Sequence, residues 1–232
     1  PVVIATDVAF SAVGEIEGRS VLLPGIAIEV GEKRIYPRST LASQIIGYTG
    51  KIQSYKSYYE NYQSAGYALN DEVGLDGIEK SQENWLTACI SERQGSRVME
   101  RDSNGKLTRQ ISYHEPTDGN NVKLTLIASY QQRAERAIQE NVEYIRDEQE
   151  KKMQDGDWLE TNKEKINIRD WEADPVRLAE KGVLLIIDVH NGKILAMAQY
   201  PTYDLNAMVA GGEAAQAIVA DKRGLLMNYA IQ

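Results

Sequence analysis

Residues 182–201 read GVLLIIDVHNGKILAMAQYP, and this stretch predicts a β-hairpin. Val183 to Ile187 has the composition of a buried strand, because branched aliphatic side chains fit a pleated sheet. Asn191-Gly192 is a strong turn signal between two such runs. Lys193 to Ala198 is expected to return as the partner strand, and Pro201 ends it.

A long helix is predicted upstream of this hairpin. Its apolar residues recur at helical spacing, at Ala134, Ala137, Ile138, Val142 and Ile145. Ser129, with Gln132 three residues later, predicts a capping box at its start, and Asp155-Gly156-Asp157 predicts its end. Residues 133–181 carry 10 basic and 14 acidic side chains, a density typical of a solvated helix face. Residues 157–174 fit either a loop or a further helix.

The remaining predicted elements are short. Val98 to Arg101 and Lys106 to Tyr113 flank Asn104-Gly105 and predict another hairpin. Residues 1–40 are expected to be extended, with β-rich runs at Val2 to Ala5 and at Ile26 to Val30. The other elements are a strand at Val122 to Leu126 and short helices at Thr40 to Ile46 (closed by Gly47), Glu79 to Cys89 and Ala214 to Ala220. The predicted fold class is therefore α+β, with short strands, hairpins and one long helix.

The composition is close to the average for globular domains. Of the 232 residues, 42% are hydrophobic and 26% are charged, which excludes a collagen-like, disordered or disulfide-stapled chain. The formal net charge is −8, so the chain lacks the cationic surface of a nucleic-acid-binding protein, and no nucleic-acid partner is expected. The longest apolar run, Val183 to Ile187, is too short to span a membrane. The chain starts at Pro1 rather than Met, which we interpret as a fragment of a longer protein.

No metal or other cofactor is expected. The single cysteine, Cys89, cannot form an internal disulfide and is expected to be a buried structural thiol. His114 and His190 lie far apart, and the sequence contains neither HExxH nor CxxC. Five of the 13 tyrosines fall between Tyr48 and Tyr62. They indicate either a half-exposed surface segment or a surface that contacts carbohydrate or a partner.

The motifs that could carry chemistry are weak. Ser103-Asn104-Gly105-Lys106 matches the SxxK pattern of penicillin-recognising enzymes. That chemistry needs Ser and Lys one helical turn apart, whereas these residues span a predicted hairpin turn and have no SxN or KTG partner. Asp71-Glu72 and the pair Asp76 and Glu79 are the densest carboxylates, and loop solvation or helix capping is the favoured interpretation. Gly47-Tyr48-Thr49-Gly50 matches a KH-type GxxG loop, against which the negative charge argues.

Five sequence blocks follow one another in a fixed order. They are Arg34-Ile35-Tyr36-Pro37; IGYTGKI at 46–52; GLDGIEK at 74–80; DGNNVKLT at 118–125, leading to Gln131; and GVLLIID at 182–188 with GKILAM at 192–197 and YPTYDLN at 200–206. In this order they resemble a class B penicillin-binding protein, from Arg34 to Asn206 and more weakly at Asn228-Tyr229-Ala230. The positions carried over as structural motif residues are Arg34, Tyr36, Pro37, Gly47, Gly50, Gly74, Gly77, Glu79, Gly192, Pro201, Asp204 and Asn206. None of them is a catalytic residue or a metal ligand in that family.

The resemblance implies a two-part organisation. Residues 1–181 would be the non-catalytic pedestal, or dimerisation domain, which in that family follows a single membrane anchor. Residues 182–232 would be the opening hairpin and helix of a truncated transpeptidase domain. The SxxK serine, SxN and KTG would lie beyond Gln232, so this chain is not expected to be an enzyme, whereas its parent would be a serine-type D,D-transpeptidase.

The resemblance also implies a location and partners. The parent would cross-link peptidoglycan at the extracytoplasmic face of a bacterial membrane, held by an N-terminal transmembrane helix that this chain lacks. Expected partners are cell-wall synthesis proteins such as a membrane glycan polymerase, and a second copy in a homodimer. The parent would recognise peptidoglycan stem peptides and β-lactams. Exposed strand edges, including that of Val183 to Ile187, also predict self-association.

The chain departs from the family pattern in four places. Ile127 stands where the family usually has Asp, and Asn228-Tyr229-Ala230 stands where it has Asn-Arg-Ala. Leu86-Thr87-Ala88 replaces a compact Leu-x-Gly segment, and the acidic stretch around 146–178 is longer than expected. These departures indicate a divergent member.

Two structural expectations accompany the resemblance. Gly74 and Gly77 are expected to supply turn conformations that a Cβ atom disfavours. Arg34 and Glu79 either form a bidentate ion pair that joins two distant motifs or remain two separate solvated charges.

Three other functions are also compatible with the sequence. The first is an enzyme that acts through Ser103 or through acidic residues. The second is a secreted scaffold that binds glycan strands or a partner through the tyrosine-rich segment, including Tyr58 and Tyr59. The third is a regulatory homologue whose transpeptidase has degenerated.

Overall fold

The computed structural model describes residues 4–19, 22–26, 28, 33–101, 103, 107–162 and 178–231. The chain forms two units, Pro1–Ile35 and Tyr36–Gln232. The described residues contain helices and three separate two-stranded antiparallel sheets, together with one long helix. The predicted α+β class, with short strands, hairpins and one long helix, is confirmed.

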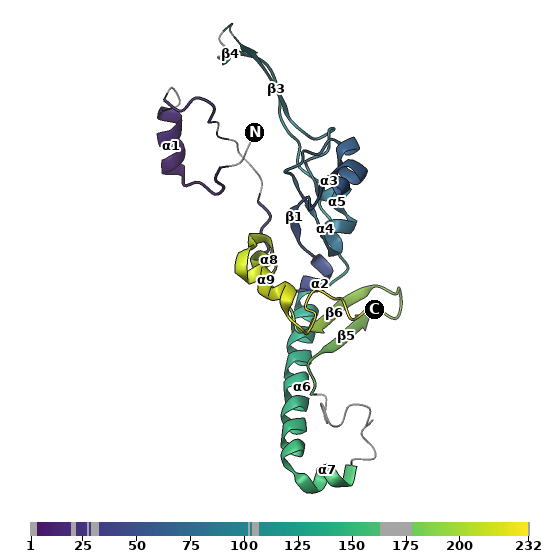
Figure 1. Cartoon of the computed structure of the whole chain (residues 1–232). Coiled ribbons are helices and arrows are strands. Elements are labelled where there is room, and N and C mark those ends of the chain that lie inside the picture. Colours follow the sequence, from purple (N-terminus) through teal and green to yellow (C-terminus); the bar gives the residue numbers. More distant parts are fainter. Residues whose placement is uncertain are drawn as a thin grey trace. The chain divides into compact units, whose positions relative to one another are not determined.

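The elements follow one another as Figure 1 shows along its colour bar. Their bounds are α1 Phe10–Gly18, α2 Ser43–Ile46, β1 Thr49–Lys51, α3 Tyr55–Ser57, η1 Tyr58–Tyr62, η2 Gln63–Ala65, β2 Glu72–Gly74, α4 Gly77–Ser81, α5 Glu83–Leu86, β3 Ser96–Arg101, β4 Leu107–His114, α6 Ala128–Gln154, α7 Gly156–Asn162, β5 Gly182–Ile187, β6 Ile194–Tyr200, α8 Leu205–Ala210 and α9 Gly212–Ala220. Every described helix is too short or too polar to cross a membrane.

The N-terminal unit contains a helix, so the prediction that residues 1–40 are extended was wrong. Helix α1 ends with an ion pair between Arg19 and Glu15, at the i,i+4 spacing that supports helices. Gly14 and Gly18 have low helix propensity and obscured this helix in the sequence. The described residues of the two predicted β-rich runs lie in no strand, and the others lie outside the described part of the chain.

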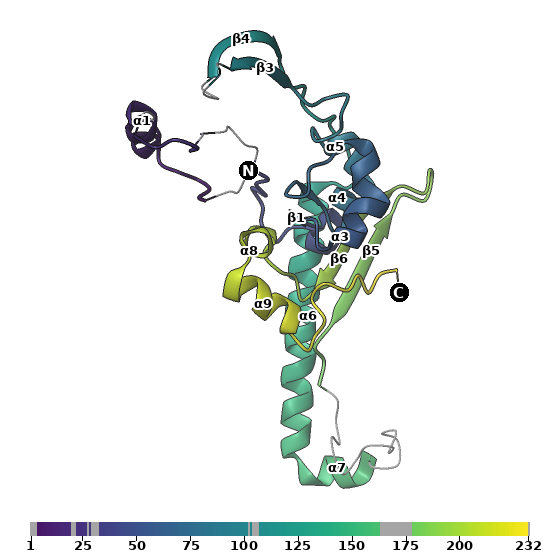
Figure 2. The same cartoon turned by 45° about the horizontal axis from the view of Figure 1, so that its top comes forward.

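Strands β5 and β6 form the predicted C-terminal hairpin, with Leu185 opposite Met197. One face of this hairpin packs against α6 through Ala134, Ala196 and Ala198, which are all buried. Figures 1 and 2 both show α6 running alongside the hairpin. Small side chains at this contact let the helix approach the sheet closely. The opposite face of β5 exposes its other aliphatic residues, Val183, Leu185 and Ile187.

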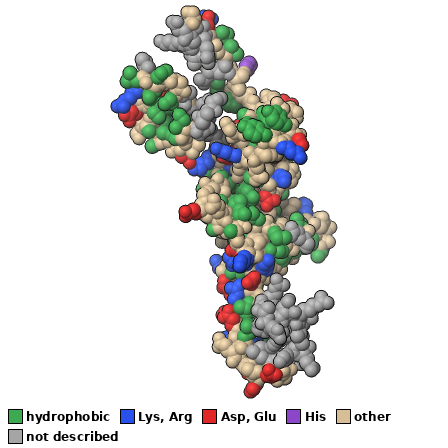
Figure 3. All heavy atoms as spheres, in the orientation of Figure 1, with side chains coloured by type: hydrophobic (Ala, Val, Ile, Leu, Met, Phe, Trp, Pro, Cys, Tyr) green, Lys and Arg blue, Asp and Glu red, His purple; other side chains and the backbone are tan. Residues whose placement is uncertain are grey.

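Helix α6 ends at Gln154, before Asp155, as predicted. The predicted buried face is only partly correct, because Ala134, Ile138 and Val142 are buried, whereas Ala137 and Ile145 are exposed. Charged side chains of both signs are interspersed over the lower part of the molecule in Figure 3, where α6 and α7 lie. The charge-rich stretch therefore includes a solvated helix face, and α7 occupies part of the segment that the sequence left undecided.

The start of α6 differs from the prediction in two ways. Ile127 is the N-cap and makes no side-chain capping bond, so the capping box at Ser129 was wrong. Residues 122–126 form no strand. They lead instead to the edge of β6, where the Thr125 hydroxyl donates to the Ile194 carbonyl over 2.6 Å and the Ile127 N–H donates to the Leu195 carbonyl over 2.8 Å. These two isolated bonds satisfy carbonyl groups on the edge of β6 that does not face β5, but they do not form a continuous strand ladder.

Gln131 completes that edge. Its side-chain amide donates to the Met197 carbonyl over 2.8 Å and accepts from the Met197 N–H over 2.9 Å. We call such a reciprocal pair of bonds, between one side-chain amide and backbone groups, an amide clamp. Gln131 is 1% exposed, and buried backbone groups need partners, so this side chain takes the place of a neighbouring strand.

The other half of the larger unit holds the two remaining sheets. Thr49 lies opposite Gly74 in the β1–β2 pair. The predicted hairpin of β3 and β4 is confirmed, with Ser96 opposite His114 and two bulges, although residues 102 and 104–106 of its turn lie outside the described residues.

The short predicted helices also appear, with altered bounds. Helix α2 ends at Gly47, whose φ is +74°, and α9 lies where a short helix was expected. The predicted helix from Glu79 to Cys89 is divided into α4 and α5.

We predict that Gln131→Leu lowers the free energy of unfolding by about 2–4 kcal/mol, because it leaves two buried backbone groups of Met197 without partners. The matched control is Gln132→Leu, at an exposed position of the same helix turn, which should change stability by about 0.5 kcal/mol or less. Urea unfolding of both variants measures this. Equal stability of the two variants would contradict the structural role of the Gln131 clamp.

Candidate functional site at a buried polar junction

The residues of the recognised blocks converge where residues 36–47 lie against the C-terminal residues 200–231 and against α4. We call this region the junction. Its apolar centre is formed by Tyr36, Tyr203, Leu205 and Leu225, which are all buried. Since these residues come from the two ends of the larger unit, the junction joins its first segment to its last.

An amide clamp lies at the N-terminal side of the junction, between Asn206 and Tyr36. The Tyr36 N–H donates to Asn206 Oδ1 over 3.0 Å, and Asn206 Nδ2 donates to the Tyr36 carbonyl over 2.8 Å. Asp204 holds Asn206 in place, because its carboxylate caps α8 by accepting from the N–H groups of Asn206 and Ala207. The Leu205 N–H adds a bond to the Ser39 carbonyl over 2.9 Å. Three family-matched residues, Tyr36, Asp204 and Asn206, thus act together here.

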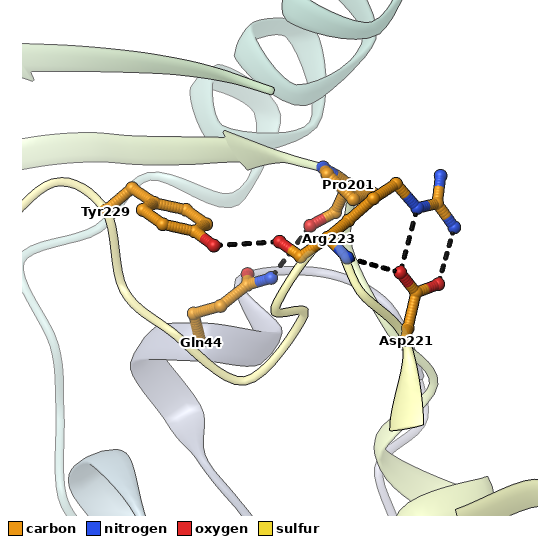
Figure 4. A network of polar contacts seen from close by, with 5 residues as sticks. All are labelled: Gln44, Pro201, Asp221, Arg223 and Tyr229. Carbon is orange, nitrogen blue, oxygen red and sulfur yellow. Dashed lines mark hydrogen bonds and ion pairs between the residues drawn. The ribbon is translucent and has the colours of Figure 1, made fainter. Parts of the chain in front are cut away.

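Gln44 makes a further connection, shown in Figure 4. Its Nε2 donates to the carbonyl oxygens of Pro201 and Leu225, over 3.0 and 3.1 Å. The segment that it contacts is braced by Arg223, whose guanidinium donates twice to the Asp221 carboxylate, while the Tyr229 hydroxyl donates to the Arg223 carbonyl over 2.8 Å. The hydrogen bonds from Arg223 lower the pKa of Asp221 to about 2, so the pair stays charged at neutral pH.

Ser43 and Tyr203 form the most buried polar contact of the junction. Ser43 is fully buried, and its hydroxyl donates to Gln44 Oε1 over 3.0 Å. The Tyr203 hydroxyl donates to the Ser43 carbonyl over 3.2 Å. Burial, followed by the charge of Asp76, raises the pKa of Tyr203, so this phenol remains a neutral donor.

Gly47 and Gly77 face each other at the edge of the junction. Both have positive φ, +74° and +58°. A Cβ atom on Gly77 would lie 2.5 Å from the Ile45 carbonyl oxygen, and one on Gly47 would lie 2.0 Å from the Asp76 carbonyl oxygen. The expectation that Gly77 supplies a turn conformation is confirmed. In addition, the neighbouring backbone leaves no room for a Cβ atom at either glycine.

Glu79 lies behind these glycines. It is 6% exposed, and its Oε1 accepts from the Tyr36 hydroxyl over 3.2 Å. Gly74 lies in β2 without a positive φ, so the turn conformation predicted for it was wrong. Close packing against α4 requires a glycine there instead, because a Cβ atom would lie 2.2 Å from the Glu79 carbonyl carbon. Arg34 belongs to the N-terminal unit, so its ion pair with Glu79 stays a prediction.

The remaining family-matched positions lie around the junction rather than in it. Pro37 is exposed beside Tyr36, Gly50 lies in β1 against the end of the Leu75 side chain, and Gly192 closes the turn between β5 and β6. The sequence reasoning named Gln131 only at the end of a recognised block, and it missed the buried polar residues Ser43, Gln44 and Gln199. No sequence pattern marked them, since such side chains usually lie at the surface.

The candidate chemical groups are not assembled into a site within the described residues. Ser103 is exposed in a turn, and Lys106 lies outside the described residues. No group of three or more His, Cys, Asp or Glu side chains that could hold a metal ion occurs among the described residues. Cys89 is half-buried rather than fully buried. Asp71 accepts from the Ala68 N–H, which is the loop-capping role that the sequence favoured.

Glu135 of α6 reaches the junction from below α2. Its Oε1 accepts from the Ala42 N–H over 2.8 Å and from Gln131 Nε2 over 2.7 Å. Burial raises the pKa of Glu135, and the two hydrogen bonds only partly oppose that effect.

We predict that replacing Gly77 with Ala destabilises the chain more than replacing Gly192 with Ala. Both glycines have positive φ, which costs a residue with a Cβ about 1–2 kcal/mol. A Cβ meets nothing within 4 Å at Gly192 but meets backbone at Gly77, so overpacking should add about 1–3 kcal/mol there. Denaturant unfolding measures both variants, and equal losses would disprove the close approach at Gly77.

We also predict a pH effect from Glu135. Because its pKa is raised on folding, its favourable contribution is fully present below the ordinary pKa of 4.5 and is lost as pH rises through the folded value. Glu135→Gln keeps the acceptor oxygen and removes the charge, so its stability relative to the unmodified chain should increase from pH 4 to pH 7. Glu143→Gln, at an exposed position on the same helix, is the control. A pH-independent difference for Glu135→Gln would refute the raised pKa.

Comparisons with known proteins identify the family. The family model described as the penicillin-binding protein dimerisation domain matches residues 1–124. The peptidoglycan D,D-transpeptidase MrdA of Salmonella typhimurium is 25% identical over 189 residues, covering 81% of this chain and 23% of that protein. The peptidoglycan D,D-transpeptidase FtsI of Escherichia coli is 24% identical over 184 residues, covering 79% and 22%. The chain thus spans less than a quarter of the length of these relatives.

Two solved structures share the fold. A chain of a peptidoglycan synthase complex that coordinates polymerization and crosslinking aligns with a TM-score of 0.59 and 23% identity, over 98% of this chain and 34% of that one. The complex of penicillin-binding protein PBP2 with MreC from Helicobacter pylori aligns with a TM-score of 0.57 and 20% identity, over 97% and 34%. With a family model that matches more than half of its residues, the chain belongs to the penicillin-binding protein dimerisation domain family.

Proposed function

We propose that the chain is the non-catalytic pedestal of a peptidoglycan D,D-transpeptidase, with residues 1–181 as the pedestal and 182–232 as the opening hairpin and helix of the catalytic domain. Its role is to hold that domain away from the membrane and to present surfaces to other cell-wall synthesis proteins. The parent protein then cross-links peptidoglycan stem peptides and reacts with β-lactams.

The observation that carries this proposal is the junction. In this proposal the pedestal fixes the orientation of the domain that it carries. A single hydrogen bond would let that domain rotate about it, so several bonds at different positions are needed. The Asn206 clamp joins residues 170 positions apart through two bonds, and Gln44 adds two more bonds to residues 201 and 225. Several buried bonds of this kind fix both distance and direction, which supports a positioning role.

The proposed location and partners follow from the relatives. MrdA and FtsI are named as peptidoglycan D,D-transpeptidases, and the similar solved structures come from a complex with MreC and from a peptidoglycan synthase complex. We place the parent at the extracytoplasmic face of a bacterial membrane, anchored by an N-terminal helix, with a glycan polymerase or a second copy as partners. The exposed aliphatic face of β5 is then covered by the rest of the catalytic domain.

A fluorescent penicillin tests this proposal. The full reading frame that encodes this chain should give a protein that is covalently labelled, and replacement of the serine of an SxxK motif downstream of residue 232 should abolish labelling. The 232-residue chain alone should remain unlabelled. Labelling of the chain alone would favour the enzyme hypothesis, and an unlabelled full-length protein would favour a scaffold or a degenerate regulatory homologue.

A glycan-binding scaffold is the second candidate. It is supported by the ring of Tyr59, which is 61% exposed and lies edge-on to Tyr58 with centroids 5.3 Å apart. Nearby, Tyr48, Tyr62 and Lys80 line an open pocket. If this candidate is correct, the chain should sediment with purified glycan strands, and Tyr58→Ala with Tyr59→Ala should abolish sedimentation. Equal sedimentation of the double variant would remove it.

A further inference from the structure

Ala42 has a backbone conformation that alanine rarely adopts. Its φ and ψ are +53° and +33°, in the left-handed region where a Cβ atom crowds the following carbonyl. The residue is 5% exposed and directly precedes α2, whose Ser43 and Gln44 make the buried bonds of the junction. Strain of this kind persists only where surrounding contacts enforce it. Contacts around Ala42 therefore hold its backbone in this conformation.

One side-chain contact that holds Ala42 comes from Glu135 of α6. Figure 1 shows α2 beside the N-terminal part of α6. The Ala42 N–H donates to Glu135 Oε1, and the same oxygen accepts from Gln131 Nε2. One carboxylate oxygen therefore holds both a strained residue of the junction and the side chain that clamps β6.

Gln131 extends the connection to the hairpin. It donates both to Glu135 and to the Met197 carbonyl, and it accepts from the Met197 N–H. The Ala42 and Met197 backbones therefore share Glu135 and Gln131 as intermediaries. Neither segment can shift without breaking or redirecting a bond of this buried set.

We propose that Glu135 is a conformational latch, which holds Ala42 in its left-handed state and couples the position of α2 to that of β6. In the latched state, α2 has one fixed position relative to the hairpin of β5 and β6. When the latch opens, Ala42 relaxes toward an ordinary backbone conformation, α2 shifts within the junction, and Gln131 loses the acceptor that orients it toward Met197. The biological use rests on the proposed function, in which such a change would alter how the pedestal holds the catalytic domain.

Amide hydrogen exchange of the 232-residue chain tests the latch without any activity measurement. Glu135→Ala should accelerate exchange about tenfold or more at Met197 and at the α2 amides of Ile45 and Ile46, which bond to the Ala42 carbonyl. Glu135→Gln keeps the acceptor oxygen and should restore most of the protection. Glu143→Ala, at an exposed position on the same helix, is the control and should change neither region.

A second substitution separates a latch from an ordinary stabilising contact. Glycine adopts the left-handed region without strain, so Ala42→Gly combined with Glu135→Ala should restore protection of Ile45 and Ile46 but not of Met197. If Glu135→Ala alone does not fold, the double variant should fold. The proposal is overturned if exchange at both regions stays within about threefold in Glu135→Ala, or if Ala42→Gly fails to rescue α2. Neither result depends on penicillin labelling, so failure of the latch and failure of the proposed function remain distinguishable.

Discussion

The structure depends on side-chain amides that bond to backbone groups which no neighbouring strand pairs within the described residues. Gln131 clamps the Met197 backbone, and Asn206 clamps that of Tyr36. Gln199 is equivalent, since it donates to the Met227 carbonyl over 2.6 Å and accepts from the Tyr229 N–H over 2.8 Å. Each of these amides carries N–H donors beside a carbonyl acceptor, so it satisfies one backbone N–H and one backbone C=O at once.

The need for these clamps follows from the architecture. Each described sheet has two strands, and a two-stranded sheet in water is marginally stable on its own. Among the described residues, two small clusters of buried apolar side chains occur, one at the junction and one between α6 and the hairpin. With small apolar cores, the buried polar bonds decide how the segments are oriented. The β3–β4 hairpin exposes Val98, Ile111 and Tyr113 and contributes to neither cluster. We therefore expect this hairpin to open locally more easily than the segments that the clusters hold.

Local sequence signals predicted the local structure well. The Asn191-Gly192 turn and its flanking aliphatic runs were sufficient for the hairpin, and helical periodicity was sufficient for α6. Helix α1 was missed because its two glycines weaken the signal, and the strand expected at 122–126 was wrong because β6 receives only isolated bonds from that segment. In the second case, the sequence around the segment did not contain the deciding contact.

The junction could be located from the sequence only through family resemblance. The ordered blocks identified Tyr36, Gly77, Glu79 and Asn206, yet nothing in their spacing indicated that the Asn206 side chain bonds to the Tyr36 backbone. The inward orientation of Gln131 was not predicted, since a polar residue on an amphipathic helix is normally assigned to the solvated face. Which polar residue turns inward depends on the backbone edge that it meets, and that edge is set by tertiary structure.

Native-state hydrogen exchange of the unmodified chain tests most directly whether the amide clamps hold the structure together. The three N–H groups that the clamps accept belong to Tyr36, Met197 and Tyr229. These amides should exchange only through global unfolding, with a free energy equal to that from denaturant unfolding, while the amides of β3 and β4 should exchange through cheaper local opening. Exchange of the three clamped amides at the rate of the β3–β4 amides would contradict the account.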